Sequence, residues 1–338
     1  MIDTKKLLFD LSNASGVTGL DGAVSVAEGA LTDLGLATER DQMGGLTAVI
    51  KGGKKRIMLD AHIDEVGMIV TAIDGDFLRV AAVGGLDERL MVAQEVTVHG
   101  QKDIFGVFTS QPPHVKGESS DAVKLADIAI DTGYSHDELC RLVQLGDRVS
   151  FRTSAAEMLD GRFCGKSLDN RAGCAAVIAA AESILQATEH PTVIISLSAQ
   201  EELGLRGART TAFAVSPDEA VVVDVSFGDM EGLKPTECGK LGHGPMIGIS
   251  PSLHRGVTDA LINAAKCGGI AYQNEVMGGA TSTNADVIGI SGSGVRCGLI
   301  SIPLRNMHTP VEVIDIDDVT AAGRLLTQYV LSGGAESD

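Results

Sequence analysis

The chain has 338 residues, a length that favours one large domain with a smaller one over a single hydrophobic core. Its formal net charge of −18 argues against nucleic acid and against anionic membrane surfaces as partners, because both attract basic proteins. There is no apolar run of the roughly 18 residues that suggests a transmembrane helix, the first residues lack a signal-peptide pattern, and the six cysteines form no CxxC pair, so we expect a cytoplasmic protein with reduced cysteines.

Residues 1–66 are predicted to contain two helices followed by three strands. The helices carry apolar residues at helical spacing, and the strands are short apolar runs bounded by turn residues. The last predicted strand leads directly into His62. The predicted helices are 5–11 and 23–34, and the predicted strands are 36–40, 46–50 and 56–61.

The pattern changes between residues 67 and 160, where short alternating runs follow one another. Turn residues such as Gly75-Asp76, Gly84-Gly85 and Gly100 separate them. Closely spaced short strands are typical of a small β-rich domain, which we place at residues 67–160. The predicted strands are 66–73, 77–83, 95–99, 104–108, 126–132 and 148–151.

From residue 161 onward, strands alternate with helices again. This alternation predicts an α/β domain with a doubly wound, mostly parallel sheet and helices on both faces. That domain comprises residues 1–66 and 161–338, so the β-rich domain is an insertion into it. The predicted helices are 169–185, 204–213, 257–266, 285–290 and 317–331, and the predicted strands are 192–197, 220–225, 272–277 and 296–302.

Acidic residues and histidines stand at the ends of several predicted strands. In open α/β sheets, ligands bind outside the carboxyl ends of the strands, so these residues are candidates for a functional site. The candidates are His62 and Asp64 in H-I-D, Asp169 in S-L-D-N-R, Glu201 and Glu202 in Q-E-E-L-G, Asp224 in V-V-V-D, and His308 in M-H-T-P.

Each candidate also has an ordinary structural interpretation when it is taken alone. Asp169 stands where a helix should begin and could be its N-cap. Asp224 could be a turn-forming residue at the end of a strand, and either histidine could lie in a surface loop. The combination favours a functional site, because a carboxylate that ends a buried strand is costly without a partner.

The adjacent pair Glu201 and Glu202 follows a buried strand and carries the clearest chemical signal. Like charges packed together are costly unless a cation or a proton relieves them. We therefore expect separate roles, in which one glutamate binds metal and the other acts as a general base toward water. Histidine and carboxylate ligands without cysteine suit two divalent cations, Zn²⁺, Co²⁺ or Mn²⁺. Asp64 could accept a hydrogen bond from the ring of His62 and orient it.

The order of these motifs resembles the M42 family of metallo-aminopeptidases, which includes the tetrahedral and the glutamyl aminopeptidases. The resemblance extends over nearly the whole chain, and its most specific parts are E-E-L-G-L-R-G-A at 201–208 and M-H-T-P-V-E at 307–312. It also includes Gly84-Gly85, Pro112-Pro113-His114 and L-G-H-G-P at 241–245.

The resemblance implies a two-metal aminopeptidase that removes N-terminal residues from short peptides. It further implies that residues 67–160 mediate dimerisation and that the dimers assemble into a hollow tetrahedral dodecamer. The implied roles are a bridging ligand for Asp169, one metal site completed by His62 and Asp224, a second completed by Glu202 and His308, a general base for Glu201, and orientation of His62 by Asp64.

The chain differs from the family pattern at two positions. Asn306 stands where a tyrosine is usual, and the sequence reads Thr283-Asn284 where a Thr-Asp pair is common. We expect both differences to affect the substrate pocket rather than the metals. The preferred N-terminal residue and the native metal stay open.

Two other functions fit parts of the sequence. Some relatives carry an endoglucanase label, but glycan hydrolysis needs two carboxylates and no metal, and aromatic residues for sugar stacking make up only 3% of the chain. A metal-binding scaffold without activity is the second alternative. The presence of Glu201 argues against it, because a scaffold has no use for a general base.

Overall fold

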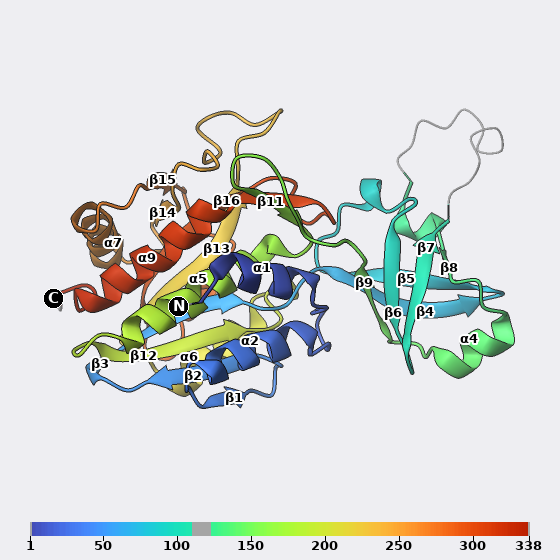
Figure 1. The fold of residues 1–338 in the computed structure, drawn as a ribbon, viewed down its shortest axis with the longest axis horizontal. Helices are drawn as coiled ribbons and strands as arrows, with labels where there is room; N and C mark the ends of the chain where they lie inside the picture. Colours follow the sequence, from blue (N-terminus) through green and yellow to red (C-terminus); the bar gives the residue numbers. More distant parts are fainter. Residues whose placement is uncertain (1, 110–122, 337–338) are drawn as a thin grey trace.

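The computed structural model of the protein describes residues 2–109 and 123–336, so Pro112-Pro113-His114 lies outside the described residues. Figure 1 shows two parts side by side, an α/β part near both chain ends and a β-barrel whose strands lie between residues 67 and 151. None of the described helices combines the length and the apolar character that crossing a membrane requires.

The α/β part is built on an eight-stranded sheet of order β1-β2-β12-β3-β13-β16-β14-β15. The four central strands run parallel, whereas β2 and β14 pair antiparallel with β12 and β16. The sheet is therefore mixed, and the predicted mostly parallel order describes its centre. The strands are β1 (Thr38–Arg40), β2 (Leu46–Ile50), β3 (Gly53–His62), β12 (Pro191–Ser198), β13 (Glu219–Phe227), β14 (Met246–Ile249), β15 (Gln273–Val276) and β16 (Arg296–Leu304).

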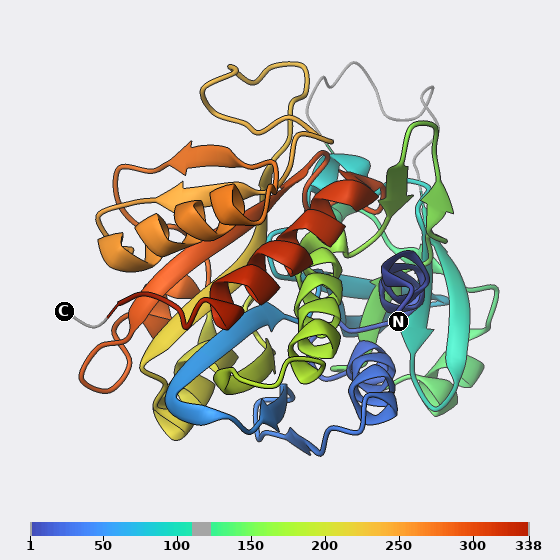
Figure 2. The ribbon, with the colours of Figure 1, turned by 60° about the vertical axis from the view of Figure 1, so that its left-hand side comes forward.

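The central strands are buried on both faces, because alternate residues enter two separate cores. On β3, Ile57 and Leu59 pack on one face and Met58 packs on the other. Figure 2 shows α9, in red, lying beside α5 over the first face. The first face is covered by α1 (Thr4–Asn13), α2 (Gly22–Asp33), α5 (Leu168–Leu185), α7 (Arg255–Cys267) and α9 (Ile316–Leu331), and the second by α6 (Arg206–Val215) and α8 (Ala285–Ile288).

Several elements of this part differ from the prediction. Helix α6 begins at Arg206 rather than at residue 204, because Gly204 and Leu205 have left-handed φ angles of 101° and 61°. The short strand β14 was not predicted. Nor were β10 (Ala156–Glu157), β11 (Arg162–Gly165) and β17 (Glu312–Asp315), which form a three-stranded sheet. These strands have two to four residues, too few to show a clear alternation.

The second part is a closed barrel of order β4-β5-β8-β7-β6-β9 with its own hydrophobic core. The predicted strand at 126–132 is wrong over most of its length, since residues Leu125–Asp127 form a 3₁₀ turn and only Ile130–Asp131 pair with β5 and β7. Helix α4 (His136–Leu142) was missed, although Ser135 and Glu138 form a capping box. The barrel strands are β4 (Gly67–Asp74), β5 (Phe77–Val83), β6 (Glu95–His99), β7 (Asp103–Phe108), β8 (Ile130–Asp131) and β9 (Arg148–Phe151).

The loop between α1 and α2 joins the barrel to the α/β part. Val17 forms a parallel β-bridge with Glu65, and its side chain packs so close to Gly67 that a Cβ atom there would collide with it. Arg148 of β9 donates a hydrogen bond of 2.6 Å to the carbonyl of Thr18. The end of β3, which carries the candidate residues, is thereby held between the two parts.

Candidate functional site

The candidate residues converge at the carboxyl ends of the central strands. His62 is the last residue of β3, and Asp224 lies near the end of β13. Glu201 and Glu202 follow β12, and His308 follows β16. Together with Asp169 at the start of α5 they line a cleft of about 340 Å³. Because parallel strands end at the same edge of a sheet, residues far apart in the sequence meet there.

Asp169 lies between the two histidines. One carboxylate oxygen, Oδ1, lies 3.0 Å from Nε2 of His62, and the other, Oδ2, lies 3.3 Å from Nε2 of His308. Asp169 does not cap α5, because Asn170 accepts the hydrogen bond from the N–H of Gly173 at 2.9 Å, whereas both carboxylate oxygens of Asp169 face the histidines. Its carboxylate therefore faces the cleft from between two imidazoles.

Two groups of possible metal ligands share Asp169. His62, Asp169 and Asp224 form one group, and Asp169, Glu202 and His308 form the other, each with ligand atoms within 4.8 Å of one another. Nε2 of His62 lies 3.7 Å from Asp224, and Nε2 of His308 lies 3.6 Å from Glu202. Two atoms bound to one tetrahedral zinc ion at about 2.0–2.1 Å lie about 3.3 Å apart, so both groups are close to the spacing that a shared ion requires.

Both histidines turn the same ring nitrogen toward the carboxylates. Nδ1 of His308 donates to the carbonyl of Gly85 at 2.7 Å, and Nδ1 of His62 donates to the carbonyl of Asp64 at 3.3 Å. A carbonyl can only accept, so in the neutral ring Nε2 carries the lone pair and faces the cleft. This is the tautomer that a metal ligand needs.

The charges of the cluster also suit divalent cations. Asp169, Glu201, Glu202 and Asp224 carry four negative charges when they are all ionised, which equals the charge of two divalent ions. Two of these carboxylates, those of Glu202 and Asp224, hold protons more tightly than usual. Burial, together with the charge of Asp169, raises the pKa of Glu202 to about 8, and burial raises the pKa of Asp224 well above its ordinary value.

At the histidines and Asp169 the pKa shifts favour the charged forms instead. The hydrogen bond with Asp169 raises the pKa of His308 to about 10. Burial raises the pKa of Asp169, but its hydrogen bonds with His308 and His62 outweigh burial and leave the pKa below its ordinary value. Asp169 is thus ionised in the middle of the cluster, while Glu202 and Asp224 hold protons more tightly than usual.

Glu201 belongs to neither group that shares Asp169, and it forms a third group of possible ligands with His62 and Glu202. Its Oε2 is 3.9 Å from Nε2 of His62, and its side chain is 12% exposed to the cleft. Burial raises the pKa of Glu201 above its ordinary value. A carboxylate that is open to the cleft and holds a proton more tightly than usual is suited to taking a proton from water.

The carboxylate of Asp64 holds the backbone of the two glutamates. It accepts hydrogen bonds from the N–H groups of Glu201 at 3.1 Å and Glu202 at 3.3 Å. Its Oδ1 lies 3.7 Å from Nδ1 of His62, which is longer than a hydrogen bond, and the ring uses the carbonyl of Asp64 instead. Asp64 thus positions His62 through its main chain and the glutamates through its side chain.

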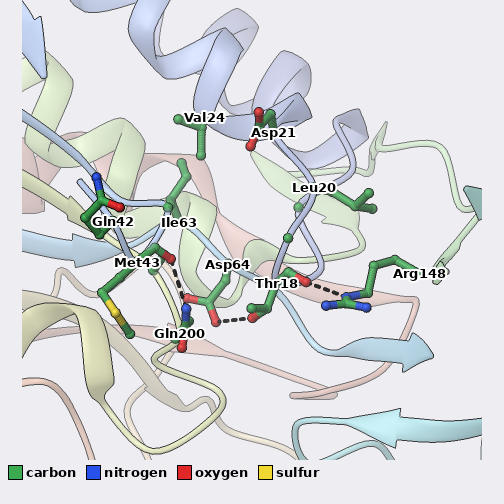
Figure 3. Close-up of a pocket in the computed structure, with 14 residues that line it drawn as sticks. Thr18, Leu20, Asp21, Val24, Gln42, Met43, Ile63, Asp64, Arg148 and Gln200 are labelled. Carbon is green, nitrogen blue, oxygen red and sulfur yellow. Dashed lines mark hydrogen bonds between the residues drawn. The ribbon is translucent and has the colours of Figure 1, made fainter. Parts of the chain in front are cut away.

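Figure 3 shows a second pocket of about 330 Å³ on another side of Asp64. Three of its polar side chains are hydrogen-bonded to other residues of the pocket wall. Thr18 donates to Asp64 at 3.4 Å, Arg148 donates to the carbonyl of Thr18, and Gln200 donates to the carbonyl of Met43 at 3.0 Å. Of these contacts, the one from Thr18 reaches Asp64 itself, and Arg148 holds the backbone of Thr18.

Glu312 is a residue of the site to which the sequence assigned no role. It is buried, and its carboxylate accepts hydrogen bonds from the N–H of Asp169 at 3.0 Å and of His308 at 2.8 Å. The M-H-T-P-V-E motif contained it, but its pairing on β17 with Gly165 of β11, shortly before Asp169, could not be read from the motif. Glu312 links the segments that carry two of the possible ligands.

Backbone conformations in the left-handed region are concentrated around the cleft. Among the described residues, nine other than glycine have such φ angles, between 45° and 63°. These conformations are costly and are found where a functional geometry requires them. Six of them belong to the segments that form the site: Ser167, Gln200, Leu205, Ser282, Asn306 and His308.

The two positions at which the chain departs from the family pattern lie in different places. Asn284 is buried beneath the cleft, where its side chain donates to Asp60 at 2.8 Å and to Ser198 at 2.9 Å. Asn306 is exposed and lines a neighbouring pocket. Of these two residues, Asn284 contacts Asp60 and Ser198 under the cleft, and Asn306 faces the neighbouring pocket.

The M42 glutamyl aminopeptidase family matches residues 44–325 of the chain. The lysyl aminopeptidase of Pyrococcus furiosus is 32% identical over 246 residues, which cover 70% of each chain.

Solved structures with the same fold include an aminopeptidase of Desulfurococcus kamchatkensis, with 32% identity, a TM-score of 0.90 and coverage of 97% of this chain and 94% of that one. The TET1 peptidase of Pyrococcus horikoshii has 27% identity, a TM-score of 0.87 and coverage of 97% of this chain and 99% of that one. It is described as able to assemble into a tetrahedron or a large octahedral shell. A Thermotoga maritima protein named endoglucanase has 28% identity, a TM-score of 0.78 and coverage of 96% and 97%.

Proposed function

Because the chain belongs to the M42 glutamyl aminopeptidase family of peptide hydrolases, we propose that it removes N-terminal residues from short peptides with the help of two divalent ions. The two groups of possible ligands that share Asp169 support this proposal most directly. His62 and Asp224 would complete one metal site, and Glu202 and His308 would complete the other. Zinc or cobalt suits these ligands best, and manganese is a further candidate.

The ions, when bound, would supply Lewis acidity to a water molecule and to the scissile carbonyl. Glu201 would take the proton from the attacking water and then donate it to the departing amine. Its carboxylate is open to the cleft, and its backbone is held by Asp64, so the group is fixed while its oxygens stay accessible. The free α-amino group of the peptide would bind at the same cluster, which limits cleavage to the first residue.

The assembly of this chain is a second part of the proposal. The similar TET1 peptidase forms closed shells, and we extend this property to the present chain as a homo-oligomer, with a tetrahedral dodecamer of dimers as the specific form. The dimer contacts would come from the inserted domain at residues 67–160, which contains the barrel. Enclosed active sites would admit short or unfolded peptides.

The alternatives have less support. The endoglucanase name of a similar protein is that protein's name, and a metal-free sugar hydrolase would have no use for two imidazoles aimed at carboxylates. An inactive scaffold would have no use for Glu201 beside the cluster.

The first test is the substitution Glu201→Gln in the zinc- or cobalt-loaded protein. Loss of the proton acceptor should lower the turnover of aminoacyl-nitroanilides by at least about a hundredfold. Metal content, measured by atomic emission, should stay at the wild-type value, because Glu201 lies outside the proposed ligand set.

Glu202→Gln is the matched control for this test. It replaces a proposed ligand and should lower both turnover and metal content. Wild-type turnover in the Glu201→Gln protein would refute the general-base assignment, and the absence of turnover from any wild-type preparation with added metal would favour the scaffold.

A further inference from the structure

Another cavity, separate from the pocket in Figure 3, adjoins the cleft that contains the ligand cluster. It has a volume of about 860 Å³. Phe227 and Met307 line both spaces, so the cavity and the cleft share a wall. Phe227 follows Asp224 on β13, and Met307 precedes His308. A peptide held at the cluster would therefore have this cavity beside it.

The cavity is lined mainly by large apolar side chains that are open to solvent. Leu90, Phe227, Met230 and Val311 are 39%, 50%, 41% and 44% exposed. They come from three separate parts of the chain: the segment after β5, the end of β13 with the loop that follows it, and the loop that follows β16. Apolar side chains from separate segments that gather around one cavity mark a binding surface for an apolar group.

The charged residues of the cavity offer little to an ionic side chain. Arg89 donates to both carboxylate oxygens of Asp87, at 2.8 and 2.5 Å, so these two charges neutralise each other. The third charged residue, Glu231, is exposed and therefore hydrated. An acidic side chain would have to compete with Asp87 for Arg89, and it would also meet Glu231.

We propose that this cavity receives a large apolar side chain of the peptide, so that the enzyme prefers leucine, methionine or phenylalanine to alanine and to glutamate next to the scissile bond. The inference rests on the proposed function, because it uses the position of the ligand cluster. The volume of the cavity exceeds that of any single side chain, so the three large residues should be accepted alike.

Two substrate series determine which peptide residue enters the cavity. In aminoacyl-nitroanilides the first residue varies, and in alanyl dipeptide amides the second residue varies. Leucine should exceed alanine in kcat/KM by roughly tenfold or more in one of the two series, since an apolar pocket discriminates by about this factor per methylene group. Glutamate should fall below alanine in the same series.

The substitution Met230→Ala links the preference to the cavity. It should lower the leucine-to-alanine ratio of kcat/KM several-fold, because it removes apolar surface from the wall. Met230→Glu should lower the ratio further by adding a second acid. The matched control is Phe213→Ala on α6, an apolar residue that is 70% exposed outside this cavity, and it should leave the ratio unchanged.

The outcomes separate this inference from the proposed function. Equal turnover of leucine, alanine and glutamate substrates in both series, or a ratio that both Met230 variants leave unchanged, would overturn the inference while the aminopeptidase activity stands. No turnover of any substrate by the metal-loaded wild type would overturn the proposed function itself.

Discussion

Two buried carboxylates outside the proposed ligand set, those of Asp64 and Glu312, organise the site in the same way. Each accepts hydrogen bonds from two backbone N–H groups of the segments that carry the candidate residues. Asp64 holds Glu201 and Glu202, and Glu312 holds Asp169 and His308. A carboxylate has two acceptor oxygens and no donor, which makes it the side chain that can satisfy two N–H groups at once.

The substitution Glu312→Gln should weaken metal binding without changing any ligand. Glutamine has only one acceptor oxygen, so one of the N–H groups of Asp169 and His308 would face its amino group. Residues that orient metal ligands typically contribute about 10- to 100-fold to metal affinity. A calorimetric zinc titration of the apoprotein measures this loss.

Glu39→Gln, on the exposed edge strand β1, is the control for that titration and should bind zinc like the wild type. The melting temperature of apo Glu312→Gln shows whether the protein is folded. Wild-type zinc affinity in a folded Glu312→Gln protein would contradict the role given to Glu312.

At the scale of elements, the first turn of α9 anchors the L-G-H-G-P loop. The carboxylate of Asp318 accepts hydrogen bonds of 2.7 Å from the N–H groups of Gly242 and Gly244. Gly244 has a φ angle of 89°, and a Cβ atom there would collide with the carbonyl of Ala271. The motif that the sequence associates with the family is thus a structural joint between α9 and the strand β14.

The anchor makes stability depend on pH in a defined direction. Burial raises the pKa of Asp318 from 3.8 to about 6, so between these values the folded protein binds more protons than the unfolded chain. The stabilisation from protonated Asp318 is complete below pH 3.8 and is lost as the pH rises through about 6. Relative to Asp318→Asn, the wild type should lose up to about 3 kcal/mol of unfolding free energy over this range.

Urea unfolding at several pH values measures this difference. Asp317→Asn, at an exposed position in the same turn, is the control and should retain the wild-type pH dependence. A parallel pH dependence of the wild type and Asp318→Asn would show that Asp318 does not titrate in this range.

At the scale of the whole molecule, the barrel carries exposed apolar side chains that fit the proposed assembly contact. Phe77, Phe105 and Leu145 expose 39%, 47% and 68% of their surface on this part of the chain. The barrel also has its own core and is held to the α/β part by the loop around Val17. A compact unit with exposed apolar residues is suited to pairing with a second copy.

Light scattering should therefore give a mass several times the 35.0 kDa of one chain. Phe105→Glu, on β7, should lower that mass because it places a charge in the proposed contact. Phe213→Glu, on α6, makes the same change outside the barrel and should leave the mass unchanged. A wild-type mass of one chain at micromolar concentration would contradict the assembly proposal.

The elements that the sequence predicted best are strands whose apolar residues alternate regularly along the segment. The strands 46–50, 77–83, 95–99 and 148–151 begin and end as expected, because alternating apolar residues and flanking turn residues are local features. The strand at 126–132 was wrong because its pairing depends on where β5 and β7 lie, which is a property of the barrel and not of the segment. The antiparallel pairing of β2 and β14 likewise depends on which strands lie beside them in the folded sheet, so it could not be predicted from these segments alone.

For the candidate site, the sequence by itself identified the residue types and their order along the chain. His62, Asp169, Glu202, Asp224 and His308 carry groups that suit a metal, and strand ends are where such groups meet. Only the tertiary structure decided what each group touches. It placed Asp169 between the two imidazoles, turned Asp64 toward the backbone of the glutamates, brought Glu312 to Asp169 and His308, and left an apolar cavity beside the cleft. The chemistry of a side chain follows from its residue type. Its partners come from distant parts of the chain, and only the completed fold brings them together.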